Sequence, residues 1–338
     1  MKKHTITDVA ALAGVSIKTV SRVLNQEPNV RPVTRDKVSA AIKSLHYRPS
    51  ASARSLAGSR SYLLALLYDN PSASYVTKVQ NGVLATCRRQ QYDLLIHPCD
   101  YRGPDLGKEI TELVRNTRLD GMILTPPLTD ADSVRRTLKK LGTAHVFLSP
   151  GSKIKSKWTV GTNDREVSAA MVKHLVGLGH TRIAFILGHP DHRAIANRFE
   201  GFKLGMAEAG LRVLKSLCVQ GYNSFESGVE CANRLLDMKA PPTAIFASND
   251  DQAAGALKAA HQRGIAIPGE LSVAGFDDIP LASQVWPSLT TIRQPMQEMA
   301  ELAASLLIKR LRGQEPNGPD RILDSELVVR DSTGPVRA

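Results

Sequence analysis

Apolar positions in the first 45 residues of the chain repeat with the spacing of short amphipathic helices. A first set falls at i, i+3, i+4 and i+7, which is one helical face: Ile6, Val9, Ala10 and Ala13. Thr5 and Asp8 have the spacing of a capping box at the start of this helix, and Gly14 is suited to end it. The pattern therefore predicts a helix between residues 5 and 14.

Two further apolar sets predict two more helices. Ser16 is a good N-cap for the second helix. The apolar face of that helix comprises Val20, Val23 and Leu24. The third helix is expected over residues 34–45, with an inner face of Val38, Ala41, Ile42 and Leu45. Since only Ala13, Gly14 and Val15 separate the first two helices, the pair is expected to form a helix-turn-helix.

In a helix-turn-helix, the N-terminal residues of the second helix face the major groove of DNA. Arg22 can donate two hydrogen bonds to a guanine, Lys18 can donate to a guanine or a phosphate, and Ile17 can offer only apolar contact. We expect further DNA contacts from their polar neighbours Thr5, Ser16, Thr19, Ser21 and Asn25. A three-helix packing unit that binds no DNA is the alternative.

From residue 61 onwards, short apolar runs alternate with helical patterns. One series of predicted strands covers residues 62–68, 92–97, 121–124 and 145–148. A second series covers residues 158–161, 183–187, 217–220, 244–247 and 272–276. Strands that alternate with helices favour parallel sheets with helices on both faces. The sequence therefore predicts an α/β body of two doubly wound parallel-sheet lobes behind a small all-α head.

Length and composition favour a globular chain with more than one domain. The chain has 338 residues, of which 42% are hydrophobic and 22% are charged. Its longest apolar run, at residues 62–68, is too short to cross a bilayer. The basic residues at the N-terminus precede no apolar stretch, as a secretory signal would require. We therefore expect a cytoplasmic protein with no membrane partner.

Basic side chains are concentrated in the head. The first 60 residues contain eleven basic and three acidic side chains, whereas the other 278 residues contain 33 and 29. A basic module on a nearly neutral body is typical of a nucleic-acid-binding domain joined to a second functional unit. A basic surface that is merely solvated is the alternative, and the helix-turn-helix pattern argues against it.

The chain shows no motif for a metal, a cofactor or catalysis. Its four cysteines, which form no close pair and are expected to be reduced thiols, are Cys87, Cys99, Cys218 and Cys231. Gly177, Leu178 and Gly179 follow a helix and precede a strand, the reverse of the order in dinucleotide binding, so they are interpreted as a helix end. His189 and His192 lack the helical spacing of a zinc pair. We expect neither a cofactor nor a metal, and no enzymatic activity.

Polar side chains follow the carboxyl ends of several predicted strands, where parallel sheets bind ligands. They are Asp69, Asn70, Asn249, Asp250, Asp277 and Asp278, and Arg198 lies early in the helix after residues 183–187. Such groups suit a polyhydroxylated ligand, because each hydroxyl both donates and accepts hydrogen bonds. Tyr75, Trp158 or Trp286 could stack on it. In the alternative interpretation, Asp250 and Asp278 are helix N-caps and Asp69 ends a strand.

The head resembles a known family at this point. The DNA-binding signature of the lactose-repressor (LacI/GalR) family of bacterial transcription regulators is similar to residues 7–25, TDVAALAGVSIKTVSRVLN, and the resemblance continues essentially to the C-terminus. It implies a repressor that binds a near-palindromic operator as a homodimer, under the control of a small effector such as a sugar or glycoside. It also implies a periplasmic-binding-protein-like core whose chain crosses between the lobes near residues 161, 290 and 320.

The resemblance divides the chain into three parts. Residues 1–48 form the helix-turn-helix domain, 49–60 a hinge helix or linker, and 61–338 the ligand-binding and dimerisation domain. In the last part, the N-lobe covers about 61–161 and 291–320, and the C-lobe about 162–290 and 321–331. A helix as short as the hinge should be largely unfolded alone. On the operator, Leu56 stands where the family wedges an apolar side chain into the minor groove.

The resemblance also assigns effector contacts. It gives Arg198 the role of a ligand-gripping arginine, Asp277 a contact to effector hydroxyls, and Asn249 another contact. Two positions depart from sugar-responsive members: Asn223 stands where an aromatic residue is common, and Ala194 where a small hydroxyl residue is common. The effector's identity is therefore open. A transport binding protein and a sugar-modifying enzyme with a fused DNA-binding head remain alternatives.

Overall fold

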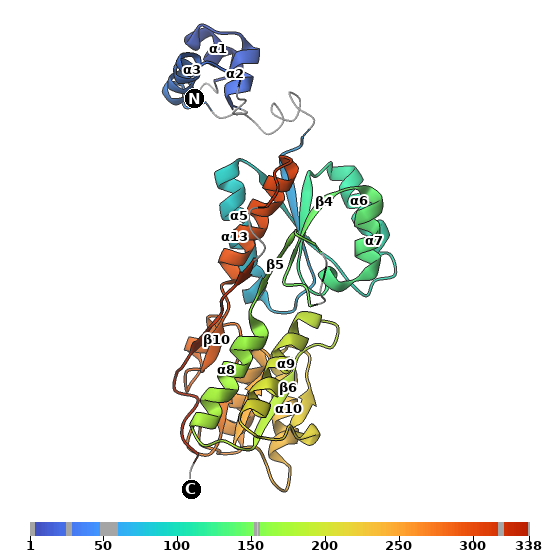
Figure 1. Ribbon diagram of the computed structural model, residues 1–338, viewed down its shortest axis with the longest axis vertical. Helices are drawn as coiled ribbons and strands as arrows, with labels where there is room; N and C mark the ends of the chain where they lie inside the picture. The colour runs from blue at the N-terminus through green and yellow to red at the C-terminus, as the bar shows by residue number, and fades with distance from the viewer. Residues whose placement is uncertain are drawn as a thin grey trace. The chain divides into compact units, whose positions relative to one another are not determined.

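The computed structural model describes residues 4–24, 29–47, 60–151, 154, 156–316 and 321–336, and it divides between Tyr62 and Leu63 into two compact units. The first unit is the all-helical head, drawn in blue in Figure 1. Its helices are α1 (Ile6–Ala13), α2 (Ile17–Leu24) and α3 (Pro32–Ser44). Asn25, Leu56 and the predicted hinge up to residue 59 lie outside the described residues.

A small apolar core joins the three helices of the head. Val9, Val20 and Val38, one from each helix, are fully buried. The predicted capping box is present: the Asp8 carboxylate accepts from the Thr5 amide at 2.7 Å, and the Thr5 hydroxyl accepts from the Asp8 amide at 3.4 Å. Gly14 ends α1 with φ of +66°, a conformation that favours glycine. This tight turn delivers the chain directly into α2.

The first lobe of the second unit is built on a six-stranded parallel sheet with the order β11-β5-β4-β3-β1-β2. The strands are β1 (Leu63–Tyr68), β2 (Asp93–Pro98), β3 (Gly121–Leu124), β4 (Ala144–Leu148), β5 (Thr159–Thr162) and β11 (Ile322–Leu323). Figure 1 shows α5 (Ala73–Gln90) and α13 (Met296–Leu311) side by side on one face, with α6 (Leu106–Thr117) and α7 (Asp132–Leu141) on the other. Close approach of α5 and α13 requires Gly82, because a Cβ there would lie 2.3 Å from the Gln297 carbonyl oxygen.

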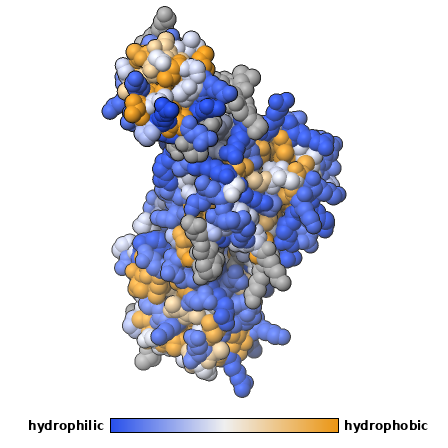
Figure 2. All heavy atoms as spheres, turned by 45° about the horizontal axis from the view of Figure 1, so that its top comes forward, coloured by the Kyte–Doolittle hydropathy of each residue, from blue (hydrophilic) through white to orange (hydrophobic). Residues whose placement is uncertain are grey.

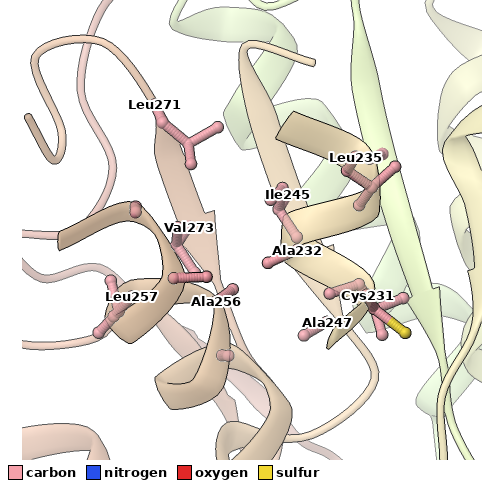
Figure 3. Packing of buried hydrophobic residues seen from close by; sticks show 14 of the residues in the cluster. Cys231, Ala232, Leu235, Ile245, Ala247, Ala256, Leu257, Leu271 and Val273 are labelled. Carbon is pink, nitrogen blue, oxygen red and sulfur yellow. The ribbon is translucent and has the colours of Figure 1, made fainter. Parts of the chain in front are cut away.

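The second lobe is built on a four-stranded parallel sheet with the order β7-β6-β8-β9. Its strands are β6 (Ile183–Leu187), β7 (Cys218–Gln220), β8 (Ala244–Ala247) and β9 (Ser272–Ala274). Alternate residues of β6 point to opposite faces, as the strand period requires. Ile186 packs in the cluster beneath α10 (Phe225–Leu236) and α11 (Asp250–Gln262), which is drawn in Figure 3. Phe185 packs on the other side, beneath α8 (Asp164–Gly177) and α9 (Arg193–Glu208).

The chain crosses between the two lobes three times. It leaves the first sheet after β5, returns through β10 (Thr291–Arg293) to α13, and leaves again after β11 through β12 (Glu326–Val328). Strands β10 and β12 pair antiparallel as a two-stranded ribbon. The tail beyond β12 packs on the second lobe, where the Ser332 hydroxyl donates to the Val273 carbonyl at 2.6 Å.

Two strands differ from their predicted places. The strand predicted at residues 158–161, which the sequence groups with the second series, is β5 of the first sheet, because it pairs with β4. Ile322 and Leu323, which the predicted boundary near residue 320 gives to the C-lobe, pair with β5 as well. The third crossing therefore lies beyond Leu323.

The interpretation of the glycine pair at residues 177–179 is confirmed. Helix α8 ends at Gly177, and Gly179 has φ of +93°, so these residues form a helix end and not a phosphate-binding loop. Within the described part of the chain, no helix has the length and apolar character to span a membrane. In Figure 2 hydrophobic residues on the visible surface lie in limited areas between hydrophilic ones.

Candidate functional site

A cavity lies between the two lobes, beyond the carboxyl ends of strands from both sheets. We call it the interlobe cavity. Its lining residues are Asn70, Ser72, Tyr75, Pro126, Ser149, Asp164, His192, Ile195, Arg198, Asn223, Asn249, Asp277 and Gln294. Its volume is about 50 Å³, which is room for only a few water molecules. A second cavity, of about 640 Å³, shares Ser149 and Asp164 with it.

Arg198 is a buried cation in the lining of this cavity. It projects from α9 and is 7% exposed. Its Nη2 lies 3.1 Å from Asp277 Oδ1, and its Nε lies 3.3 Å from Asp164 Oδ2. Its Nη1 donates to the Ser248 carbonyl, and its Cζ lies 3.8 Å from the centroid of the Phe276 ring. Burial lowers the pKa of Arg198, but the two carboxylates outweigh it and raise that pKa, so the guanidinium stays charged.

Asp277 is held in place by contacts around its backbone and side chain. Its amide donates to the Ile292 carbonyl at 2.8 Å, and Gln294 Nε2 donates to its Oδ1 at 2.6 Å. Its backbone φ of +114° lies in a region that residues other than glycine rarely adopt. Burial raises the pKa of Asp277 to about 6, against the opposing charge of Arg198. A carboxylate so fixed can accept a hydrogen bond from a ligand without rearranging.

Three more of the predicted effector contacts line the cavity. Asn249 caps α11, since its side chain accepts from the Gln252 amide at 3.0 Å, while its Nδ2 donates to the Asn223 carbonyl at 3.0 Å. The Asn70 side chain accepts from the Ser72 amide at 2.9 Å. Tyr75 lies in the first turn of α5, and burial raises the pKa of its hydroxyl. These residues present amide and hydroxyl groups to a ligand.

Several predicted residues lie elsewhere. Asp69 is not among the lining residues; its carboxylate accepts from the Tyr101 amide at 3.0 Å and so anchors the loop after β2. Trp286 is 89% exposed. The N-cap interpretation is wrong for Asp250, which accepts from the Ile279 amide at 2.9 Å inside the lobe. It is also wrong for Asp278, which pairs with two arginines, Arg293 and Arg330.

Some lining residues are absent from the predicted set. Asp164 shares Arg198 with Asp277, and it had the same signal as the others, since it follows the carboxyl end of β5. His192 lies at the start of α9, and burial lowers its pKa to about 4, so it is neutral. Asn223, noted only as a departure from the family, accepts from the His189 amide at 3.1 Å. No sequence pattern indicated that Gln294 would line the cavity.

Outside the lining residues of the cavity, side chains from both lobes also contact each other. The Tyr101 hydroxyl and the Arg102 guanidinium, from the loop after β2, both donate to Asp191, which precedes α9 in the second lobe. We call these three residues the latch. Arg102 and Asp191 are 62% and 40% exposed at their side chains, so each contact is screened by water. Lys78 of α5 also reaches the second lobe, where its Nζ donates to the Asp278 carbonyl at 2.7 Å.

In the head, α2 carries the residues predicted to contact DNA. Ile17, Lys18 and Arg22 are exposed on it, whereas Val20 and Val23 face the core. The Ser16 hydroxyl caps the helix by accepting from the Thr19 amide at 3.2 Å. An exposed face with one apolar and two cationic side chains has the chemistry needed to contact base edges and phosphates.

Comparison with known proteins shows which family has this architecture. Residues 5–50 match the family described as bacterial regulatory proteins, lacI family, and residues 172–333 match the periplasmic binding protein-like domain. The HTH-type transcriptional regulator DegA of Bacillus subtilis (strain 168) is 35% identical over 337 residues, which cover 99% of each chain. The chain belongs to the lacI family of bacterial regulatory proteins. It is a helix-turn-helix, DNA-binding transcriptional regulator.

Other members of the lacI family agree with this assignment. The HTH-type transcriptional repressor PurR of Vibrio cholerae serotype O1 (strain M66-2) is 33% identical over 334 residues, or 97% of each chain. The structure of the lac repressor dimer bound to operator and the anti-inducer ONPF matches 98% of this chain and 100% of its own, with 27% identity and a TM-score of 0.77. The transcriptional regulator CelR–cellobiose complex matches 97% and 99%, with 27% identity and a TM-score of 0.73. The predicted fold class is thereby confirmed, and the sequence relatives are regulators and not enzymes.

Proposed function

We propose that this regulator is a repressor that binds a near-palindromic operator as a homodimer and responds to an uncharged, polyhydroxylated effector, such as a sugar or glycoside, in the interlobe cavity. The proposed division has a DNA-binding head at residues 1–48, a hinge at 49–60 and a ligand-binding and dimerisation body at 61–338. The lac repressor dimer on its operator and the cellobiose complex of CelR support the two halves of this proposal by analogy.

The observation that carries the effector class is the placement of Arg198 between Asp164 and Asp277. A sugar hydroxyl can donate to a carboxylate and accept from the guanidinium at once. Asn249, Asn70 and Tyr75 add amide and hydroxyl groups around this centre. Asp69 drops out of the proposed contacts, and Asp164 joins them.

The charge of the cavity favours an uncharged effector over an anionic one. Two buried carboxylates, Asp164 and Asp277, face one guanidinium, and His192 is neutral at physiological pH. A phosphate or carboxylate group on the ligand would add a third negative charge in a site with little water, and like charges repel strongly there. A neutral sugar therefore suits the cavity better than a sugar phosphate.

The effector enters when the lobes separate. The present cavity of about 50 Å³ is far below the several hundred Å³ of a typical ligand site. An effector that binds one degree of closure more tightly than another shifts the lobes toward that state. In our proposal this shift changes the spacing of the two hinges in the dimer. The spacing in turn decides whether the hinge segments fold into helices on DNA.

On the DNA side, we propose that α2 enters the major groove. Arg22 would contact a guanine, Lys18 a guanine or phosphate, and Ile17 an apolar base edge. Ser16, Thr19, Ser21, Thr5 and Asn25 are proposed as supporting contacts, and Leu56 as the minor-groove wedge.

The experiment that tests the proposal is selection of bound duplexes from a random DNA pool at near-physiological salt. We expect an enriched palindrome. Repeating the selection with neutral sugars, phosphorylated sugars and nucleobases, in parallel with thermal unfolding, tests the effector class. Neutral sugars should shift both readouts for the natural chain and not for Asp277→Asn. A response confined to phosphorylated ligands would contradict the charge argument, and turnover of the added sugar would favour the enzyme alternative.

A further inference from the structure

Three side chains with metal-binding chemistry meet outside the interlobe cavity, on the outer edge of the first sheet. They are His97, Cys99 and Glu109, whose ligand atoms all lie within 4.8 Å of one another. Among the described residues, this is the one such group of three. None of the three lines the cavity.

The fold brings these residues together from two elements. His97 lies near the end of β2, and Cys99 follows it by two residues, so both side chains point to the same side of the strand. Helix α6 covers that side and supplies Glu109 from its first turn. The Cys99 amide donates to the Tyr68 carbonyl at 2.8 Å, which continues the sheet pairing and fixes the position of the thiol.

The polar contacts of the three residues leave the thiol without a strong partner. His97 Nε2 lies 2.6 Å from Glu109 Oε1. Cys99 is 8% exposed, and the one contact that its thiol makes in the described structure is a weak one, 3.9 Å from the His97 carbonyl oxygen. Burial, together with the carboxylates of Glu109 and Asp69, raises the pKa of Cys99 to about 12.

We propose that His97, Cys99 and Glu109 form a binding site for one divalent metal ion of the zinc class, with a water molecule as the fourth ligand. Imidazole nitrogen, thiolate sulfur and carboxylate oxygen are the ligands that zinc takes in proteins. One thiolate and one carboxylate neutralise the dication, while His97 binds in its neutral form. Binding replaces the Cys99 sulfur–hydrogen bond by a sulfur–metal bond, and the proton leaves to solvent.

The present spacing suits this ion after small side-chain movements. Zinc bonds of about 2.0–2.3 Å in tetrahedral geometry place the ligand atoms about 3.6 Å apart. The His97 and Glu109 atoms now lie closer than this, at 2.6 Å, and the thiol lies within 4.8 Å of both. Both surface-facing side chains can move, since His97 and Glu109 are 26% and 38% exposed. Their exposure also gives the ion a path from solvent.

The test is a Co²⁺ titration of the full-length protein after chelator treatment, because cobalt in a zinc site reports its ligands by absorption. We expect one equivalent to produce the visible bands of tetrahedral cobalt and an ultraviolet thiolate-to-cobalt band, and Zn²⁺ to abolish both. Cys99→Ser should remove the thiolate band. His97→Gln and Glu109→Gln should weaken Co²⁺ binding at least about tenfold.

Cys87→Ser is the matched control, because Cys87 is also a buried thiol but lies on α5, away from this group. It should leave the titration unchanged. If Cys99→Ser does not fold, the partly exposed His97→Gln variant decides the matter by its loss of affinity. Absence of a thiolate band in the natural chain, or a band that persists in Cys99→Ser, would overturn the proposal and leave His97–Glu109 as an ordinary ion pair.

Discussion

The carboxylate of Asp277 is held in position by the protein itself, without a ligand. Its unusual backbone conformation, the hydrogen bond from its amide to the Ile292 carbonyl and its contact with Gln294 hold the carboxylate against Arg198. The same guanidinium also serves Asp164, so two carboxylates share one positive charge. Burial is the main cause of the raised pKa of Asp277; the Arg198 charge opposes it, and the Asp164 charge adds to it.

The raised pKa of Asp277 gives a signed prediction for stability. Its pKa is about 6 in the folded protein, whereas the ordinary value of 3.8 applies to the unfolded chain. The folded protein therefore binds this proton more tightly. Its contribution is present below about pH 4 and is lost as the pH rises through about 6. We expect the natural chain to lose on the order of 2 kcal/mol relative to Asp277→Asn between pH 4 and pH 7.5.

Denaturant unfolding of both proteins at several pH values measures this difference. His192 also titrates near pH 4, but it is present in both proteins and cancels in the comparison. A difference in unfolding free energy that does not change with pH would show that Asp277 titrates normally.

Arg198 should be essential for the stability of the second unit. Arg198→Met leaves Asp164 and Asp277 buried without a cation, which we expect to cost about 3–5 kcal/mol of unfolding free energy. Adding Asp277→Asn to Arg198→Met removes one of the unpaired charges and should recover part of the loss. Denaturant midpoints of the single and double variants measure this coupling, and strictly additive losses would count against a shared network.

Side-chain direction limited what sequence could predict of the cavity. Three residues predicted by the rule that ligands bind beyond strand ends, Asn70, Asn249 and Asp277, line the cavity, as does Arg198, which the family resemblance supported. It failed for Asp69, because the loop after β2 folds back and its Tyr101 amide takes the carboxylate away from the cavity. That contact spans 32 positions in the chain, and no local pattern encodes it.

Helix α2 has exposed residues that can contact DNA directly, whereas other residues of the head contribute by keeping it folded. Its exposed residues can contact bases, while the capping box at Thr5 and the core valines hold the head in shape. Local signals alone sufficed to predict this unit, since caps, apolar period and the Gly14 turn all lie within a few residues of the helices they define.

Substitution of Arg22 should change which DNA sequence is preferred. Without its guanidinium, Arg22→Ala should lose about 1–3 kcal/mol of discrimination at one base pair of each half-site. Thr5→Ala, which removes an N-cap and a proposed supporting contact but no base-reading group, should cost about 1 kcal/mol of helix stability and weaken all sequences alike. Selection from a randomised half-site with each variant measures both effects, and an unchanged preference for Arg22→Ala would remove it from base recognition.

At the level of strands, pairing between distant segments limited what could be predicted from the sequence. The β–α alternation correctly predicted two parallel sheets, yet β5 joined the first sheet and not the second. Strand β11 has only two residues, Ile322 and Leu323, and its place is fixed by β5, some 160 positions earlier. A segment so short carries no periodicity of its own.

The latch links the two lobes of the body. Exposed charge pairs such as Arg102 with Asp191 contribute at most about 1 kcal/mol. Removing the latch should therefore shift the balance between closed and open lobes by up to about fivefold, without unfolding either lobe.

Asp191→Ala tests this directly. Fluorescent probes on the exposed residues Lys140 of α7 and Arg234 of α10 would report the distance between the lobes. We expect a larger open population in Asp191→Ala and none of that change in Asp237→Ala, which removes an exposed carboxylate paired with Arg263 within one lobe. Equal populations in both variants would mean that the latch does not hold the lobes together.

The triple crossing of the chain has a consequence for biosynthesis. The head can fold as soon as Tyr47 has left the ribosome, because among the described residues its apolar cluster extends no further than Tyr47. The body must wait, since the first sheet needs β11 and the second lobe needs Ser332 from the tail. A nascent chain therefore carries a finished DNA-binding head for most of its synthesis, and a nonsense mutation between α13 and β11 would leave that head on two unfinished lobes.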